Sequence, residues 1–131
     1  MGLWIKKRIE GKNPPKVCWD VELTKGDSGY ITVALTDLQE QGITLREDDV
    51  VRCQVRAEQG TLIIDGEAVK TEDGGLIWRI APEDTKGIDP GEYVWDMQLE
   101  LPDSGDVFTF IPLSNFEILE EATRRTKTNE Q

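Results

Sequence analysis

Large apolar side chains recur at every second residue of the segment 92–101, and polar residues occupy most of the positions between them. Successive side chains of an extended chain point to opposite faces, so this spacing predicts a β-strand with one buried face. The sequences DPG before it and PDSG after it favour chain reversals, because Pro fixes φ and Gly tolerates positive φ. The apolar members of the strand are Tyr93, Trp95, Met97, Leu99 and Leu101.

Other runs of alternating or β-branched residues are separated by turn sequences such as KGDSG, EQG, DG and EDGG. Many short strands joined by such turns are typical of an all-β sandwich or barrel. The only sustained helical pattern begins at Ile118, where we expect a short C-terminal helix that ends in a polar tail. The further strands that we expect cover residues 17–23, 29–36, 50–56, 61–69, 76–81, 106–111 and 116–119.

The chain has 131 residues, 37% of them hydrophobic, which suits one domain with one core. We therefore expect a basic arm at residues 1–16, a β-sandwich at 17–119 and a polar tail at 120–131. Side chains alternate between the two faces of each strand, and this alternation, which we call strand parity, predicts which side chains point inward. The inward set is Trp19, Val21, Ile31, Val33, Leu35, Val51, Cys53, Val55, Leu76, Trp78, Ile80, Tyr93, Trp95, Met97 and Leu99.

Charge is distributed unevenly along the chain. Its 15 Lys and Arg against 26 Asp and Glu give a net charge of −11, which disfavours binding to the phosphate backbone of nucleic acids. Residues 1–16 nevertheless carry a net charge of +4, which leaves −15 for the remainder. They lack the apolar core of a signal peptide, and no run approaches the length of a membrane span. We expect a soluble protein that starts in the cytoplasm and has neither nucleic-acid nor membrane partners.

The arm combines basic residues with two large apolar side chains, and the candidate contact residues are Trp4, Ile5, Lys6, Lys7 and Arg8. Two arrangements stay open. The arm is either an edge strand on its own domain, or it reaches the acidic domain of a neighbouring copy, where apolar burial supplies affinity and opposite charge supplies orientation. The second arrangement predicts a homo-oligomer.

The two cysteines are expected to be free thiols. Cys18 alternates with the apolar face of its strand and points away from it, whereas Cys53 shares the apolar face of its own strand with Val51 and Val55. Side chains on opposite faces rarely reach the Cα separation that a disulfide requires. Free thiols are typical of a reducing compartment.

The sequence DPGEY predicts a tyrosine corner. In immunoglobulin-like sandwiches a Tyr at the start of the F strand sends its hydroxyl back to an upstream backbone group. Here the motif consists of Asp89, Gly91 and Tyr93, and Trp95 stands where antibody domains have a cysteine. We therefore interpret Tyr93 and Trp95 as parts of a core corner rather than as a ligand-binding platform, and we expect an immunoglobulin-like antiparallel β-sandwich of seven to eight strands.

Residues 25–119 resemble the small immunoglobulin-like module at the N-terminus of phage baseplate upper proteins and related prophage tail-region proteins. The resemblance is carried by GDS at residues 26–28, by Pro82, Asp84 and Thr85, and by the sequence PGEYVWD at residues 90–96. It implies a module without enzymatic activity that attaches other parts to a tail apparatus. We expect no receptor-binding region behind the module, so the implied role is structural or assembly rather than host recognition, first in the bacterial cytoplasm and then in the virion.

Catalytic and metal-binding residues are sparse in the sequence. The chain contains no His, the commonest general base near neutral pH and the commonest metal ligand. Two acidic loops are candidates for weak calcium binding, one with Glu47, Asp48 and Asp49 and one with Asp103 and Asp106. Neither has the ligand spacing of an EF-hand, so we interpret both as solvated turns and expect no cofactor and no bound metal.

Two classes of function stay open after these observations. The first is a non-enzymatic phage or prophage structural protein of the tail or baseplate region that contacts itself and other virion proteins. The second is a soluble immunoglobulin-like module that recognises a protein or a carbohydrate. A carbohydrate binder is expected to expose aromatic side chains, whereas parity places three of the four Trp residues inside.

Overall fold

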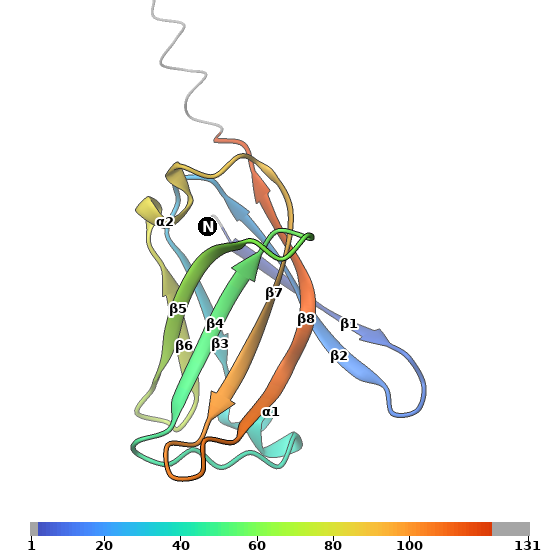
Figure 1. The fold of residues 1–131 in the computed structure, drawn as a ribbon, viewed down its shortest axis with the longest axis vertical. Helices are drawn as coiled ribbons and strands as arrows, with labels where there is room; N and C mark the ends of the chain where they lie inside the picture. The colour runs from blue at the N-terminus through green and yellow to red at the C-terminus, as the bar shows by residue number, and fades with distance from the viewer. Residues whose placement is uncertain (1–2, 122–131) are drawn as a thin grey trace, which may run out of the picture.

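The computed structural model describes residues 3–121, and these residues form a mostly β fold (Figure 1). One sheet contains eight strands in the order β1-β2-β8-β7-β4-β5-β6-β3. The strands are β1 (Leu3–Glu10), β2 (Lys16–Thr24), β3 (Gly29–Val33), β4 (Val50–Arg56), β5 (Leu62–Lys70), β6 (Leu76–Ile80), β7 (Gly91–Glu100) and β8 (Val107–Leu119). Two short helices, α1 (Leu35–Glu40) and α2 (Pro82–Lys86), connect strands.

The sheet curls until its two ends approach each other, so the fold is barrel-like. β5 pairs with β4 over most of its length and with β6 through its last two residues, Val69 and Lys70. At the far ends, Leu3 of β1 packs against Gly29 of β3, where an added Cβ would lie 2.6 Å from the Leu3 Cδ1 atom. Only glycine leaves room for this close approach.

Most adjacent strands are antiparallel, but β2 and β8 pair in parallel, with Val21 opposite Phe116 and Thr24 opposite Leu119. The purely antiparallel sheet expected from the sequence is therefore wrong at this pair. A parallel neighbour leaves no local signature in either strand, because β2 and β8 lie at opposite ends of the chain and no hairpin turn joins them.

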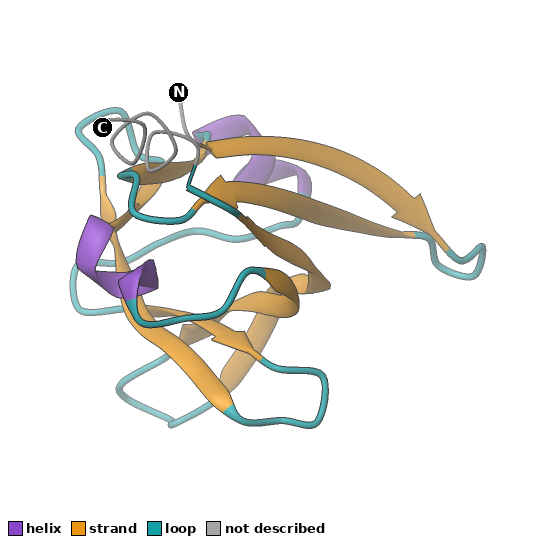
Figure 2. Cartoon of the chain, turned by 90° about the horizontal axis from the view of Figure 1, so that it is seen from above, coloured by secondary structure: helices purple, strands orange, loops and turns teal. Residues whose placement is uncertain are grey.

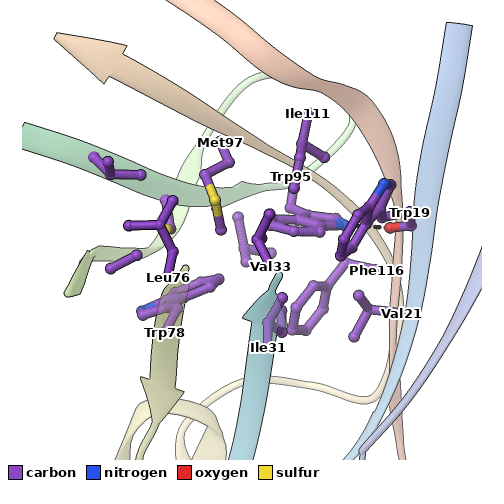
Figure 3. Packing of buried hydrophobic residues seen from close by; sticks show 14 of the residues in the cluster. Trp19, Val21, Ile31, Val33, Leu76, Trp78, Trp95, Met97, Ile111 and Phe116 are labelled. Carbon is purple, nitrogen blue, oxygen red and sulfur yellow. Dashed lines mark hydrogen bonds between the residues drawn. The ribbon is translucent and has the colours of Figure 1, made fainter. Parts of the chain in front are cut away.

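The core forms between two layers of the curled sheet, a first layer of β1, β2, β8, β7 and β4 and a second layer of β5, β6 and β3. Figure 3 shows its aromatic centre. Trp95 is fully buried, stacks on Trp78 with ring centroids 6.1 Å apart and meets Phe116 edge-on at 6.4 Å. Gly66 of β5 lies beneath Trp78, since a Cβ there would be 2.5 Å from the Trp78 Nε1 atom. The strand parities thus placed the three core tryptophans, Trp19, Trp78 and Trp95, correctly.

Two members of the predicted inward set differ from expectation. Leu35 is 41% exposed, because the strand expected over residues 29–36 ends at Val33 and a helix begins at Leu35. Within that helix Leu38 points into the core instead. The Asp37 carboxylate accepts the Ala34 backbone N–H at 3.1 Å and so caps the first turn. Tyr93 is half-buried and packs against the core from its margin.

β8 replaces the two strands expected at residues 106–111 and 116–119. Trp95 of β7 pairs with Ser114, but Met97 pairs with Ile111, so Pro112 and Leu113 of β8 lie opposite the single residue Asp96 and β8 carries one extra residue there. This bulge breaks the side-chain alternation within β8, which explains why the sequence pattern predicts two separate strands here. The strand expected at residues 116–119 is present as the end of β8, whereas the helix expected from Ile118 does not begin there, and the rest of that expected helix lies mostly outside the described residues.

Candidate interaction site

β1 and β2 form a hairpin that leaves the body of the protein and projects sideways (Figures 1 and 2). The two strands pair without a break from Leu3 opposite Leu23 to Glu10 opposite Lys16. Residues 3–10, expected as part of an arm, therefore lie against β2 of their own chain in this structure, as the edge-strand alternative describes. The base of the hairpin contributes to the core, whereas the tip of the hairpin, residues 11–15, extends beyond the second layer of the fold.

An ion-pair network covers the outer face of the hairpin. The Arg8 guanidinium donates to Asp20 at 2.7 Å and to Glu10 at 2.9 Å, and each of these carboxylates raises the pKa of Arg8. The Arg8 hydrogen bond in turn lowers the pKa of Asp20. Asp20 also accepts the Asn115 backbone N–H of β8 at 3.0 Å. This carboxylate therefore ties the hairpin to the last strand of the sheet.

The inner face of the hairpin carries Lys7, which faces the body. Its ammonium lies 3.1 Å from the Asp37 carboxylate of α1 and 4.5 Å from the centre of the Trp19 ring. An ammonium over an indole face is attracted by the ring quadrupole. Lys7 thus connects the hairpin to α1.

The remaining candidate residues of the arm fall into different environments. Ile5 packs against the core, Lys6 is exposed, and Trp4 is 54% exposed on the outer face. Trp4 borders a shallow depression of about 340 Å³ together with Asp20 and Glu117. The structure therefore does not gather the five arm residues into one contact surface.

β2 and β8 separate on the side of the hairpin tip, and we call the space between residues 16–19 of β2 and 109–113 of β8 the fork. Where the strands part, side chains replace ladder hydrogen bonds. The Trp19 backbone N–H donates to the Ser114 hydroxyl at 2.9 Å, and Cys18 Sγ lies 3.8 Å from the Leu113 carbonyl oxygen. Among the described residues, the part of β8 from Val107 to Ile111 pairs with β7 alone, and the bulge residues Pro112 and Leu113 are in register with neither neighbouring strand. The fork therefore exposes part of one edge of β8.

The fork opens into a groove of about 1000 Å³ between the hairpin, β8 and α1. Three apolar side chains on its walls are exposed: Ile9 by 73%, Val17 by 43% and Leu113 by 57%. Val17 belongs to the apolar face predicted for its strand, yet the second layer ends before it. Parity predicts the face on which a residue lies but not how far the opposite layer extends, so the sequence did not reveal this surface.

Asp96 lies beside the same groove, opposite the bulge in β8. Burial raises the pKa of its carboxyl, and the Arg56 charge offsets part of this effect. Lys16 lines the hairpin side of the groove and Glu40 the α1 side. The groove thus combines apolar side chains on its walls with charged residues of both signs at its margin.

The residues of the predicted corner lie together at the start of β7. The Tyr93 hydroxyl donates to the Asp89 carbonyl oxygen at 2.6 Å, across the turn that contains Gly91. The crossing segment before it is tied down as well, since Asp84 accepts the Ala81 N–H at 2.8 Å and the buried Thr85 hydroxyl accepts the Gly26 N–H at 2.9 Å. The corner is a set of backbone-directed hydrogen bonds around a buried core.

The two acidic loops form ordinary turns. Asp49 accepts the Arg46 backbone N–H at 2.8 Å, whereas Glu47 and Asp48 are exposed. Asp103 and Asp106 lie in the turn between β7 and β8, where the Asp106 N–H donates to the Ser104 hydroxyl at 3.2 Å. Within residues 3–121, no group of three or more Cys, Asp or Glu side chains is arranged to hold a metal ion.

Both cysteines are free and buried. Cys53 belongs to the core, and its burial raises the pKa of the thiol well above the usual range. Cys18 belongs to β2 of the hairpin, opposite Arg8, and is buried outside the core cluster. The free thiols predicted from opposed strand faces are thus confirmed.

In the part of the chain that the structure describes, no helix is long and apolar enough to cross a membrane. No protein family model matches the sequence, and no curated protein matches it either.

Proposed function

We propose that this chain is a non-enzymatic structural or assembly protein of a phage or prophage tail or baseplate region, built as an immunoglobulin-like sandwich. It acts through contacts with copies of itself and with other virion proteins, first in the bacterial cytoplasm and then in the virion. The observation that carries the proposal is the projecting hairpin, which presents exposed apolar side chains and a local excess of basic residues beside an acidic body.

The strand order supports the immunoglobulin-like part of the proposal. β2-β8-β7-β4 and β5-β6-β3 follow one another in the order in which two facing sheets of such a sandwich are connected, with β5 passing from one to the other. The Tyr93 hydroxyl bonds upstream at the start of β7, as in a tyrosine corner. β1 is an addition at the edge of this arrangement.

Exposed apolar side chains on a projecting element support a role in protein contacts. Monomeric proteins rarely expose contiguous apolar surface without a partner for it. On the hairpin, Ile9 and Val17 are directly opposite each other in the strand register, so their exposed surfaces adjoin. A scaffold that builds repeating assemblies uses such surfaces between its subunits.

Two measurements test this proposal. In particles purified after induction of the source phage, mass spectrometry should detect the chain at a fixed ratio to a tail protein, and antibody-gold labelling should place it on the tail. Light scattering of the purified protein should give a mass above that of one chain at micromolar concentration. Particles that lack the chain would contradict the virion role.

The exposed Trp4 favours a second candidate, a binding module for carbohydrate. Trp4 lies beside a shallow depression whose walls carry Asp20 and Glu117, and sugars stack on exposed aromatic rings while carboxylates accept their hydroxyl groups. A glycan array comparing the natural chain with Trp4→Ala tests this candidate. Sugar binding that disappears in the variant would favour it.

A further inference from the structure

The inner face of the hairpin is a continuation of the core face of the sheet. In the strand register Leu3 lies opposite Leu23, Ile5 opposite Val21 and Lys7 opposite Trp19, and all three pairs face the second layer. The next pair on this face is Ile9 and Val17, which is exposed because the second layer has ended. The tip side of the hairpin therefore continues the apolar core face, and within residues 3–121 the side chains of Ile9 and Val17 stay exposed.

Leu113 extends this surface across the fork. It is one of the two β8 residues that lie opposite Asp96 in the bulge, and it is 57% exposed toward the groove that Ile9 and Val17 also line. The surface therefore has two walls, one on the hairpin and one on β8. A partner that fits it must enter the fork rather than lie on a flat face.

The edge of β1 is a poorer contact surface than this face. Lys6, Lys7 and Arg8 are consecutive at the centre of the strand, and in an antiparallel pair of β1 strands these positive charges would oppose each other. Natural proteins place Lys on edge strands to discourage such pairing. The apolar face, not the backbone edge, is therefore the part of the hairpin suited to association.

We propose that the fork holds the hairpin of a second copy of this chain. In this two-fold pair, Ile9 and Val17 of each copy pack against those of the other, and each hairpin tip reaches the partner's fork. The arrangement is isologous, so one surface is used twice and the assembly closes as a dimer. The inference rests on the proposed function only in taking a second copy as the partner.

Charge complementarity supports this occupant. The tip of the hairpin carries the exposed Lys12, and Lys16 follows at the start of β2. The wall that a partner's tip would reach carries Glu40 of α1, which is exposed at the margin of the groove. A two-fold pair brings these opposite charges together twice, which orients the hairpins and excludes the parallel arrangement.

Sedimentation equilibrium across the micromolar range tests the pair. We expect a dimer for the natural chain and at least about a tenfold weaker association for Ile9→Glu, because pairing would bury an unpartnered carboxylate. Val17→Glu should act in the same way from the opposite strand. The matched control is Val69→Glu, since Val69 is also a β-branched strand residue and is 61% exposed, but lies far from the fork on β5. It should associate as the natural chain does.

Charge reversal provides an independent test. Glu40→Lys and Lys12→Glu should each weaken association, and the double variant should recover most of it, because the opposite charges are then restored across the two-fold axis. Circular dichroism and thermal unfolding should show that every variant folds, since all the changed side chains are exposed in the single chain.

The possible failures are distinguishable. Ile9→Glu and Val17→Glu variants that dimerise as strongly as the natural chain would overturn the fork as the contact surface, while self-association as such would stand. A natural chain that stays monomeric at high micromolar concentration would overturn the pair, and the particle measurements would still decide the virion role separately. Loss of the dimer in Val69→Glu as well would show a nonspecific effect and also overturn the inference.

Discussion

The indole Nε1 of Trp95 donates a hydrogen bond of 2.7 Å to the backbone carbonyl of Trp19, 76 residues earlier in the chain (Figure 3). The bond joins β7 to β2, which are separated in the sheet by β8. Both partners are buried, so neither has water as an alternative partner. One side chain thus fills the centre of the core and fastens β2 of the hairpin to it.

Replacing Trp95 should be among the most destabilising single changes in the core. Trp95→Ala should lower the free energy of unfolding by about 3 to 5 kcal/mol, because a large cavity replaces the ring. Trp95→Phe keeps most of the apolar volume but leaves the Trp19 carbonyl without its donor, at a cost of about 1 to 3 kcal/mol. Urea denaturation measures both. A neutral Trp95→Ala that instead abolished partner binding would contradict the assignment of Trp95 to the core.

The corner hydrogen bond should have a small, measurable effect. Tyr93→Phe removes only the hydroxyl that donates to Asp89, and we expect a loss of about 1 kcal/mol in the free energy of unfolding. Tyr30→Phe is a matched control, because Tyr30 is 47% exposed on β3 and no hydrogen bond of its hydroxyl is found within the described residues. Equal stability of the two variants would show that the corner bond contributes nothing.

The thiols should react slowly in the folded protein and completely after unfolding. Both cysteines are free and buried, and burial raises the pKa of Cys53, so little thiolate is present at neutral pH. Titration with a thiol reagent in denaturant without reductant should count two thiols per chain. A count of zero in chains that run as monomers on a non-reducing gel would mean an internal disulfide.

Asp20 should stabilise the protein more at neutral than at acid pH. The hydrogen bond from Arg8 lowers the pKa of Asp20 in the folded state, so its contribution is present above the pKa of the unfolded chain, about 4, and is lost as the pH falls through the folded value. Asp20→Asn should therefore destabilise the fold at pH 7, with a smaller effect in strong acid. Thermal unfolding as a function of pH measures the difference.

The contribution of Asp96 to stability should depend on pH in the opposite direction. Burial raises the pKa of its carboxyl in the folded state, so its favourable contribution is present below the unfolded value and is lost as the pH rises through the folded value. Asp96→Asn should raise the unfolding temperature at neutral pH relative to the natural chain, and this advantage should shrink below about pH 4. An advantage that persists unchanged in acid would contradict the assignment of the effect to this carboxyl.

Much of the fold follows from local patterns. The strand at residues 50–56 has the bounds that the sequence predicts, the strand at 76–81 is one residue longer than β6, and the strand at 92–101 is shifted by one residue at both ends relative to β7. Turn sequences and side-chain alternation act over a few residues, so they can be recognised in the sequence directly. The same patterns missed α1 and α2, because five or six residues give too few turns for helical periodicity to emerge from the background.

The sequence by itself determined the all-β class, the parity of most strands and the opposed faces of Cys18 and Cys53, since each depends on neighbours along the chain. Only the tertiary structure decided that β2 runs parallel to β8, that Pro112 and Leu113 form a bulge, and that the second layer ends before Ile9 and Val17. These features depend on segments far apart in the chain coming together. The same pattern of apolar residues therefore gives a buried core at the base of the hairpin and an exposed surface at its tip, because burial depends on what lies opposite and not on the strand alone.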